Sequence, residues 1–111
     1  MEPLALPKPK AIRQPTDFQR KIDSAVSGLE PGEVVSFGDI AARAGNPKAS
    51  RAVGSYLANS GGSIPWWRVI YASGYLPPCN PSLQAERLME EGVQLKGTLV
   101  VNSPSGRFAN E

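Results

Sequence analysis

Apolar positions recur at helical spacing between Asp17 and the glycines at positions 28 and 32, which predicts an amphipathic helix. Thr16 and Gln19 stand three residues apart at its start and match a capping box, in which each side chain bonds the other residue's backbone N–H. The apolar set is Phe18, Ile22, Ala25, Val26 and Leu29. The first helix is therefore expected to begin after Thr16 and to end near Gly28.

A second capping pattern follows a short turn. The turn at residues 30–32 leads into Glu33-Val34-Val35, a short apolar step too brief to form a free-standing strand. Ser36 and Asp39 then repeat the capping-box spacing. A short helix is therefore expected here, ended by Gly45.

The next segment predicts a further helix close behind that one. Asn46 suits an N-cap and Pro47 suits the first helical turn, so the helix is expected to restart at these residues. Two helices joined by a tight Gly-Asn turn are typical of a helix-turn-helix, although an ordinary helical hairpin has the same local pattern. Small residues that would let the two helices cross closely are Ala41, Ala42, Ala44, Ala49, Ala52 and Gly54.

The second half of the chain alternates loops with short elements. Residues 64–71 form an apolar run that is expected to be extended, and a proline-rich loop follows the turn at residues 72–74. Residues 82–91 predict a last helix, and residues 93–101 predict a short strand. The fold class expected from the whole pattern is mainly α with short strands, built around a winged-helix-like helix-turn-helix.

A chain of 111 residues is long enough for one modest core, so a single domain is expected. Residues 1–15 hold four prolines without apolar periodicity and are expected to form a flexible arm. The folded domain is expected over residues 16–97, followed by a C-terminal tail over residues 98–111, of which residues 102–111 are polar and expected to be frayed. No apolar run approaches the roughly 20 residues that cross a bilayer, and no signal peptide is evident. A protein of the cell interior is expected.

Charge and reactive residues narrow the function classes. The net charge of +2 is too small to identify a nucleic-acid binder, but residues 40–85 contain basic residues and no acidic one. Either a basic face or chance placement explains that stretch. The chain has no histidine and a single cysteine, Cys79, which excludes an intramolecular disulfide and every histidine-based nucleophile or metal site. No metal and no cofactor is expected.

One long segment resembles a known family. Residues 32–74, GEVVSFGDIAARAGNPKASRAVGSYLANSGGSIPWWRVIYASG, are similar from end to end to the DNA-binding and active-site segment of O6-alkylguanine DNA alkyltransferases. In that family a GNP-(K/R)-A-x-RAVG block forms the recognition helix, and an I-PCHR-V strand carries the reactive cysteine and its histidine. With the flanking helices the resemblance covers about residues 17–96. It implies the fold of the alkyltransferase C-terminal domain.

The departure from that family's pattern decides the expected activity. Trp66 and Trp67 stand where the enzymes have the cysteine and the histidine. An indole is a poor nucleophile with no ionisable proton near neutral pH, so alkyl transfer at this position is not expected. The chain is therefore identified as a member of the alkyltransferase-like proteins, which bind O6-alkylguanine in DNA without repairing it and signal the lesion to nucleotide excision repair. It is expected not to be an enzyme.

The resemblance implies a set of DNA-binding residues. Arg51 matches the arginine that enters the base stack and replaces an everted nucleotide, where a planar guanidinium can stack and hydrogen-bond. Phe37 takes the place of a tyrosine that borders the base pocket, without the hydroxyl. Binding is expected in the minor groove, with little sequence preference. The DNA-binding residues implied are Phe37, Lys48, Ala49, Ser50, Arg51, Gly54, Ser55 and Arg68, of which Arg68 is either structural or phosphate-facing.

The resemblance also implies a lesion pocket with Trp66 as an apolar wall in place of the thiol. Main-chain carbonyls of Trp66 and Val69 would meet the guanine amino group, and Trp67 either lines the pocket or packs in the core. The loop at residues 75–80 would close over the base, which brings Cys79 near the pocket. The pocket residues implied are Phe37, Trp66, Trp67, Val69, Tyr75, Cys79 and Asn80.

Two rival functions stay open at this point. Cys79 could act as a relocated alkyl acceptor, although no histidine is present to activate it. Alternatively, a helix-turn-helix module could have kept the scaffold and lost lesion selectivity, with the tryptophans filling the pocket. The partners expected under the leading reading are double-stranded DNA containing O6-alkylguanine and nucleotide excision repair proteins. A monomer is expected, cytoplasmic and nucleoid-associated in a bacterium and nuclear in a eukaryote.

Overall fold

A computed structural model describes residues 16–60 and 62–109 of the chain. The arm predicted over residues 1–15 lies outside these residues. The first helix, α1, spans Asp17–Ser27, as predicted. Thr16 caps it through both bonds of a capping box with Gln19, at 3.1 Å and 3.0 Å. Ile22 and Val26, one helical turn apart, are fully buried and fix the face that α1 turns toward the core.

The predicted helix pair consists of α2, Phe37–Arg43, and α3, Ser50–Ala58, which pack against each other. Ser36 caps α2 through a capping box with Asp39, in which both backbone-to-side-chain distances are 3.0 Å. Gly54 lies on the face of α3 toward Phe37, because a Cβ added at Gly54 would be 3.9 Å from that ring. A small residue at this position lets the two helices approach closely.

The start predicted for the second of these helices is wrong by three residues. Asn46 does not cap α3, because its N–H donates to Ala41 O at 2.9 Å and Gly45 has a φ of +91°. These are features of a Schellman motif, so Asn46 ends α2 and cannot begin α3. The Ala49 N–H then donates to Asn46 O at 3.0 Å, which closes a turn before Ser50. Lys48 and Ala49 therefore precede the helix.

A small parallel sheet joins distant parts of the chain. Strand β1, Glu33–Ser36, lies between β2, Val69–Ile70, and β5, Ser105–Gly106. Its register pairs Val35 with Val69 on one side and Glu33 with Ser105 on the other. Residues 33–35, which are too few for a free-standing strand, belong to a strand that is paired on both edges. The pairing stabilises a strand that the local sequence could not.

Residues 64–71 were expected to be extended, but part of this run is helical. Trp66–Arg68 form a 3-10 helix, η2, in which the Arg68 N–H donates to Pro65 O at 3.2 Å. The Val69 N–H then donates to Trp66 O and the chain enters β2. The tight turn places successive side chains about 120° apart and not on opposite faces, so neighbouring tryptophans point in different directions.

The last helix, α4, spans Pro81–Glu90 and lies within one residue of its predicted bounds. The single strand predicted over residues 93–101 is an antiparallel hairpin of β3, Gln94–Lys96, and β4, Leu99–Asn102. The frayed tail predicted over residues 102–111 is wrong for residues 102–109, because β5 pairs with β1 and the Arg107 N–H donates to Val34 O at 2.9 Å. Residues 110–111 lie outside the described part.

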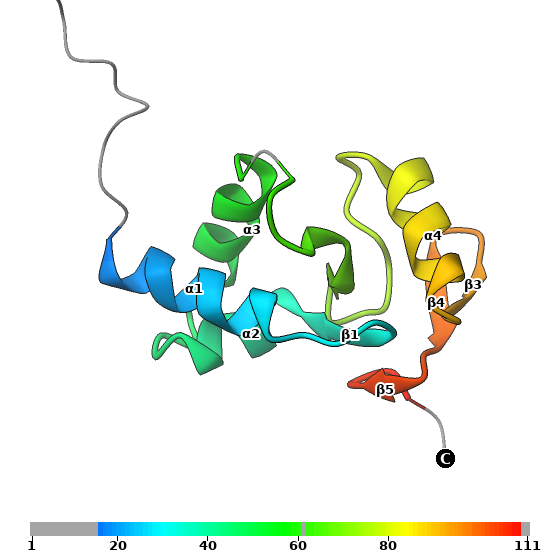
Figure 1. Cartoon of the computed structure of the whole chain (residues 1–111), viewed down its shortest axis with the longest axis horizontal. Helices are drawn as coiled ribbons and strands as arrows, with labels where there is room; N and C mark the ends of the chain where they lie inside the picture. Colours follow the sequence, from blue (N-terminus) through cyan, green and yellow to red (C-terminus); the bar gives the residue numbers. More distant parts are fainter. Residues whose placement is uncertain (1–15, 61, 110–111) are drawn as a thin grey trace, which may run out of the picture.

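Two clusters of buried residues share the sheet. Val35 and Val69 belong to a cluster with α1, α2 and α3, whereas Val34 and Ile70 belong to a cluster with α4 and β4. Side chains alternate across a strand, so β1 and β2 each supply both cores. Figure 1 shows the consequence, with α1, α2 and α3 on one side and α4 with the hairpin on the other. The predicted fold class, mainly helical with short strands and a helix-turn-helix, is confirmed.

Among residues 16–60 and 62–109, no helix is both long and apolar enough to cross a membrane.

Candidate nucleic-acid interface

An open cavity of about 830 Å³ lies between α3 and the loop before α4, with η2 and the end of β2 at its base. Figure 1 shows α3 and the loop before α4 on either side of η2. Most of its walls are apolar side chains and small residues. They come from α2, α3, η2, β2 and the loop: Phe37, Gly38, Ser50, Arg51, Gly54, Ser55, Leu57, Ala58, Gly62, Trp66, Val69, Tyr71, Ala72, Pro77, Cys79, Asn80 and Gln84.

The cavity brings together most of the residues that the sequence implied. Phe37, Trp66, Val69, Cys79 and Asn80 of the implied pocket line it, as do Ser50, Arg51, Gly54 and Ser55 of the implied DNA-binding set. Lys48, Ala49, Arg68, Trp67 and Tyr75 do not line it. The geometry thus combines the two implied sets at one place, while the role of each residue stays a prediction.

Trp66 forms part of the cavity base and also packs against the helical core. Its indole meets Trp67 edge to face, with ring centroids 6.0 Å apart and an interplanar angle of 88°. The indole is half-buried, so one part of it is fixed by packing while another borders the opening. Trp66 is therefore a rigid apolar wall of the kind the sequence implied.

The two carbonyls expected to meet a guanine amino group already accept hydrogen bonds within the protein. Trp66 O accepts from the Val69 N–H, and Val69 O accepts from Gln84 Nε2 at 3.2 Å. Gln84 Nε2 also donates to Trp67 O at 3.0 Å, and the Gln84 residue is 1% exposed. Each carbonyl has a second lone pair, so both can still accept from a ligand. Gln84 holds the backbone that presents them.

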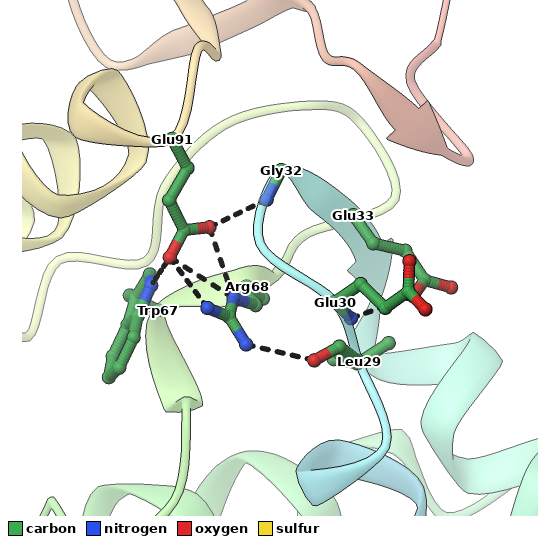
Figure 2. Close-up of polar contacts among 7 residues, drawn as sticks. All are labelled: Leu29, Glu30, Gly32, Glu33, Trp67, Arg68 and Glu91. Carbon is green, nitrogen blue, oxygen red and sulfur yellow. Dashed lines mark hydrogen bonds and ion pairs between the residues drawn. The ribbon is translucent and has the colours of Figure 1, made fainter.

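Trp67 and Arg68 point away from the cavity into a polar cluster around Glu91, shown in Figure 2. Arg68 Nη2 lies 2.7 Å from Glu91 Oε2, and Trp67 Nε1 donates to the same oxygen at 2.9 Å. The Gly32 N–H donates to Glu91 Oε1 at 2.8 Å, and Arg68 Nη1 donates to Leu29 O at 2.9 Å. The geometry supports the structural alternative for Arg68 and core packing for Trp67.

The Glu91 carboxylate is stabilised in its charged form. Burial alone would raise the pKa of Glu91, but hydrogen bonds from Arg68, the Gly32 N–H and Trp67, together with the Arg68 charge, lower that pKa below its ordinary value of 4.5. The side chains of Arg68 and Glu91 are 12% and 13% exposed. The pair therefore belongs to the interior of the protein and joins η2 to the end of α4.

The basic face suggested by the charge distribution is smaller than the sequence implied. Arg68 is internal, and Arg43 lies 4.0 Å from Glu33. Lys48 and Arg51 are exposed beside the start of α3, and neither has an acidic partner among the described residues. The first turn of α3 also has no side-chain cap, so no capping side chain occupies its N–H groups. Positive charge and free N–H groups at a helix start favour a phosphate.

Two residues of the cavity wall, Tyr71 and Gln84, and one residue behind it, Glu91, were not predicted from the sequence. Tyr71 follows β2 directly, and its ring centroid is 5.8 Å from that of Phe37. Gln84 stands four residues before buried Leu88 on α4, a helical spacing that could have placed it on the inward face. Glu91, which orients Trp67 and Arg68, had no local sequence pattern that could have identified it.

In the part of the chain that is described, no group of three His, Cys, Asp or Glu residues could hold a metal ion.

Known proteins share this architecture. Residues 17–93 match the family model described as the 6-O-methylguanine DNA methyltransferase, DNA binding domain. The DNA base-flipping protein of Escherichia coli (strain K12) is 33% identical over 97 residues, which cover 84% of this chain and 75% of that protein. A methylated-DNA–protein-cysteine methyltransferase of Methanosarcina acetivorans is 44% identical over 71 residues, covering 60% of this chain and 44% of that enzyme.

A solved structure agrees with these sequence relatives. S. pombe Atl1 in complex with damaged DNA containing O6-carboxymethylguanine superimposes with a TM-score of 0.68 and 30% sequence identity, over 76% of this chain and 83% of that chain. The helix-turn-helix with a cavity at its flank defines the class as a DNA-binding domain. The chain belongs to the 6-O-methylguanine DNA methyltransferase DNA-binding family, and the predicted alkyltransferase-like membership is confirmed.

Proposed function

We propose that this protein binds double-stranded DNA containing O6-alkylguanine, turns the modified base out of the helix into the cavity beside α3, and does not transfer the alkyl group. The observation that carries the proposal is a cavity of about 830 Å³ lined by Phe37, Arg51 and Trp66 in a member of this family. That volume lies within the roughly 300 to 1,000 Å³ usual for small-molecule sites. A cavity of this volume can hold a purine with a short alkyl group.

Arg51 is the residue best placed to replace the everted base. It is exposed on the first turn of α3, lines the cavity, and lies beside the uncapped helix start that would face a phosphate. Its guanidinium can stack on the neighbouring base pairs and hydrogen-bond the orphaned partner base, which offsets an unstacking cost of about a few kcal/mol. Because Arg51 belongs to α3, docking of this helix on the DNA would bring the guanidinium to the place that the everted base leaves.

The chemistry of the cavity favours binding over transfer. The indole of Trp66 borders the cavity and offers an apolar surface to an alkyl group but no nucleophilic lone pair. Once bound, the lesion would be either shielded or presented to nucleotide excision repair proteins. The protein would act where the DNA is, in the cytoplasm of a bacterium or the nucleus of a eukaryote.

Titrations of duplexes with and without one O6-methylguanine test the proposal. We expect wild-type protein to prefer the modified duplex, and its affinity to fall as salt rises because phosphate contacts release counterions. Arg51→Ala should weaken binding to the modified duplex by about tenfold or more, which is at least about 1.4 kcal/mol. Arg43→Ala is the matched control, because Arg43 is exposed on α2 and does not line the cavity. Equal affinity of wild type and Arg51→Ala would contradict the role of Arg51.

One rival keeps a specific observation in its favour. Cys79 is a free, exposed thiol on the cavity wall, where a relocated acceptor would have to be. Intact mass spectrometry after incubation with O6-methylguanine DNA separates the two functions. One added methyl group on the protein would overturn the binding-only proposal.

The other rival is a DNA-binding module without lesion selectivity. Competition between modified and unmodified duplexes tests it directly, and equal affinity for both would favour it over base eversion.

A further inference from the structure

Tyr71 is an aromatic residue of the cavity wall that the family resemblance did not single out. It follows β2, and its side of the cavity also carries Phe37, whose ring is tilted by 57° to that of Tyr71. The Tyr71 backbone is fixed, because its N–H donates to Tyr75 O at 3.1 Å and its carbonyl accepts from the Gly74 N–H at 2.9 Å. The ring is therefore attached to a rigid turn and borders open space.

The Tyr71 hydroxyl differs from another tyrosine hydroxyl of the domain. Tyr56 OH donates to Asp23 Oδ2 at 2.8 Å, which ties that ring to α1. For Tyr71 OH, residues 16–60 and 62–109 offer no hydrogen-bond partner, and the residue is 44% exposed. A phenol on the wall of a cavity is free to donate to a ligand or to accept from it.

The chemistry of a purine matches this pair of rings. A purine presents two apolar faces and an edge of ring nitrogens and an amino group that need polar partners once the base leaves its pair. Phe37 can offer only its ring, and Trp66 offers an apolar wall. Tyr71 combines a ring in contact with Phe37 and a hydroxyl beside it.

We propose that Tyr71 is a recognition residue for the everted base, with its hydroxyl hydrogen-bonded to the polar edge of the purine and its ring packed beside Phe37. This inference rests on the proposed base eversion. The hydrogen bond to the base then comes from Tyr71, which follows β2, and not from position 37 of the helix-turn-helix, where this chain has a phenylalanine without a hydroxyl.

Tyr71→Phe removes the hydroxyl alone, and Tyr56→Phe is the control for the loss of a tyrosine hydroxyl elsewhere in the domain. Tyr56 does not line the cavity, and its hydroxyl is bonded to Asp23, so Tyr56→Phe should leave binding to the modified duplex unchanged. Fluorescence anisotropy with an O6-methylguanine duplex should show roughly 2- to 12-fold weaker binding for Tyr71→Phe, the factor that corresponds to one hydrogen bond of about 0.5 to 1.5 kcal/mol. Binding to the unmodified duplex should not change, and neither should the melting temperature.

The outcomes separate this inference from the proposed function. If wild type prefers the modified duplex and Tyr71→Phe equals it, the inference about Tyr71 is wrong and base eversion stands. An equal loss on modified and unmodified duplexes would also overturn the inference, because the hydroxyl would then contact the DNA backbone. If wild type shows no preference for the modified duplex, the proposed function itself fails.

Discussion

Replacing Glu91 by glutamine tests whether the interior ion pair holds the base of the cavity. The glutamine has nearly the same shape, but it removes the charge that faces Arg68 at 2.7 Å, and its NH₂ group replaces the oxygen that accepts either from Trp67 Nε1 or from the Gly32 N–H. Breaking a buried pair by changing one partner costs about 3 to 5 kcal/mol, and the lower end applies because both side chains keep some exposure. We expect a loss of about 3 kcal/mol.

Thermal and urea unfolding, followed by circular dichroism and tryptophan fluorescence, measure this loss. About 3 kcal/mol corresponds to a melting temperature lower by roughly 12 to 24 °C in a domain of this size. Glu90→Gln is the matched control, because Glu90 is the preceding residue and is exposed on α4. A Glu91→Gln protein that unfolds within about 0.5 kcal/mol of the control would refute the assignment of Arg68 and Glu91 to the interior.

The same residue predicts a dependence on pH. The pKa of Glu91 is lower in the folded protein than its ordinary value of 4.5, so its contribution to stability is complete at neutral pH. That contribution is lost as the pH falls from about 5 through the folded-state pKa. The difference in unfolding free energy between wild type and Glu91→Gln should therefore shrink on acidification. A difference that stays constant down to about pH 3 would contradict the lowered pKa.

Two further predictions concern the cavity wall. Alkylation of Cys79 by iodoacetamide, followed by intact mass, should slow when a saturating O6-methylguanine duplex is present, since the thiol lines the cavity; an unchanged rate would place the base elsewhere. Gly54→Ala should raise stability by about 0.5 to 1 kcal/mol, because Gly54 is inside α3 and the new methyl would make an ordinary 3.9 Å contact with Phe37. The same methyl narrows the cavity that Gly54 lines, so binding to the modified duplex should weaken while the melting temperature rises. A lower melting temperature would count against this packing.

Local patterns predicted the parts of the fold that local interactions determine. Both capping boxes join residues three positions apart, and the structure has both pairs of bonds. Asn46 shows the limit, because the same residue type suits the end of one helix and the start of the next. Only the bond from the Asn46 N–H to Ala41 O decides between them.

The sheet and the side-chain orientations depend on distant residues and could not be read locally. Strand β1 pairs with β5, and the paired residues Glu33 and Ser105 are 72 positions apart in the chain. Most of the implied pocket residues belong to one continuous motif and meet at the cavity, whereas Arg68 turns toward Glu91, 23 positions later in the chain. A motif indicates which residue types are present at a site. It does not indicate which of their side chains bond a distant residue and so point away from the site.

The division of buried residues between two cores affects how the opening can respond to a guest molecule. Its α3 wall is anchored in one core and the wall before α4 in the other, with β1 and β2 contributing to both. A substitution that loosens one of the two cores should therefore displace one wall of the cavity relative to the other. Tolerance for bulkier alkyl groups should depend on substitutions at Val34 or Ile70 in the second core as well as on the side chains that line the cavity.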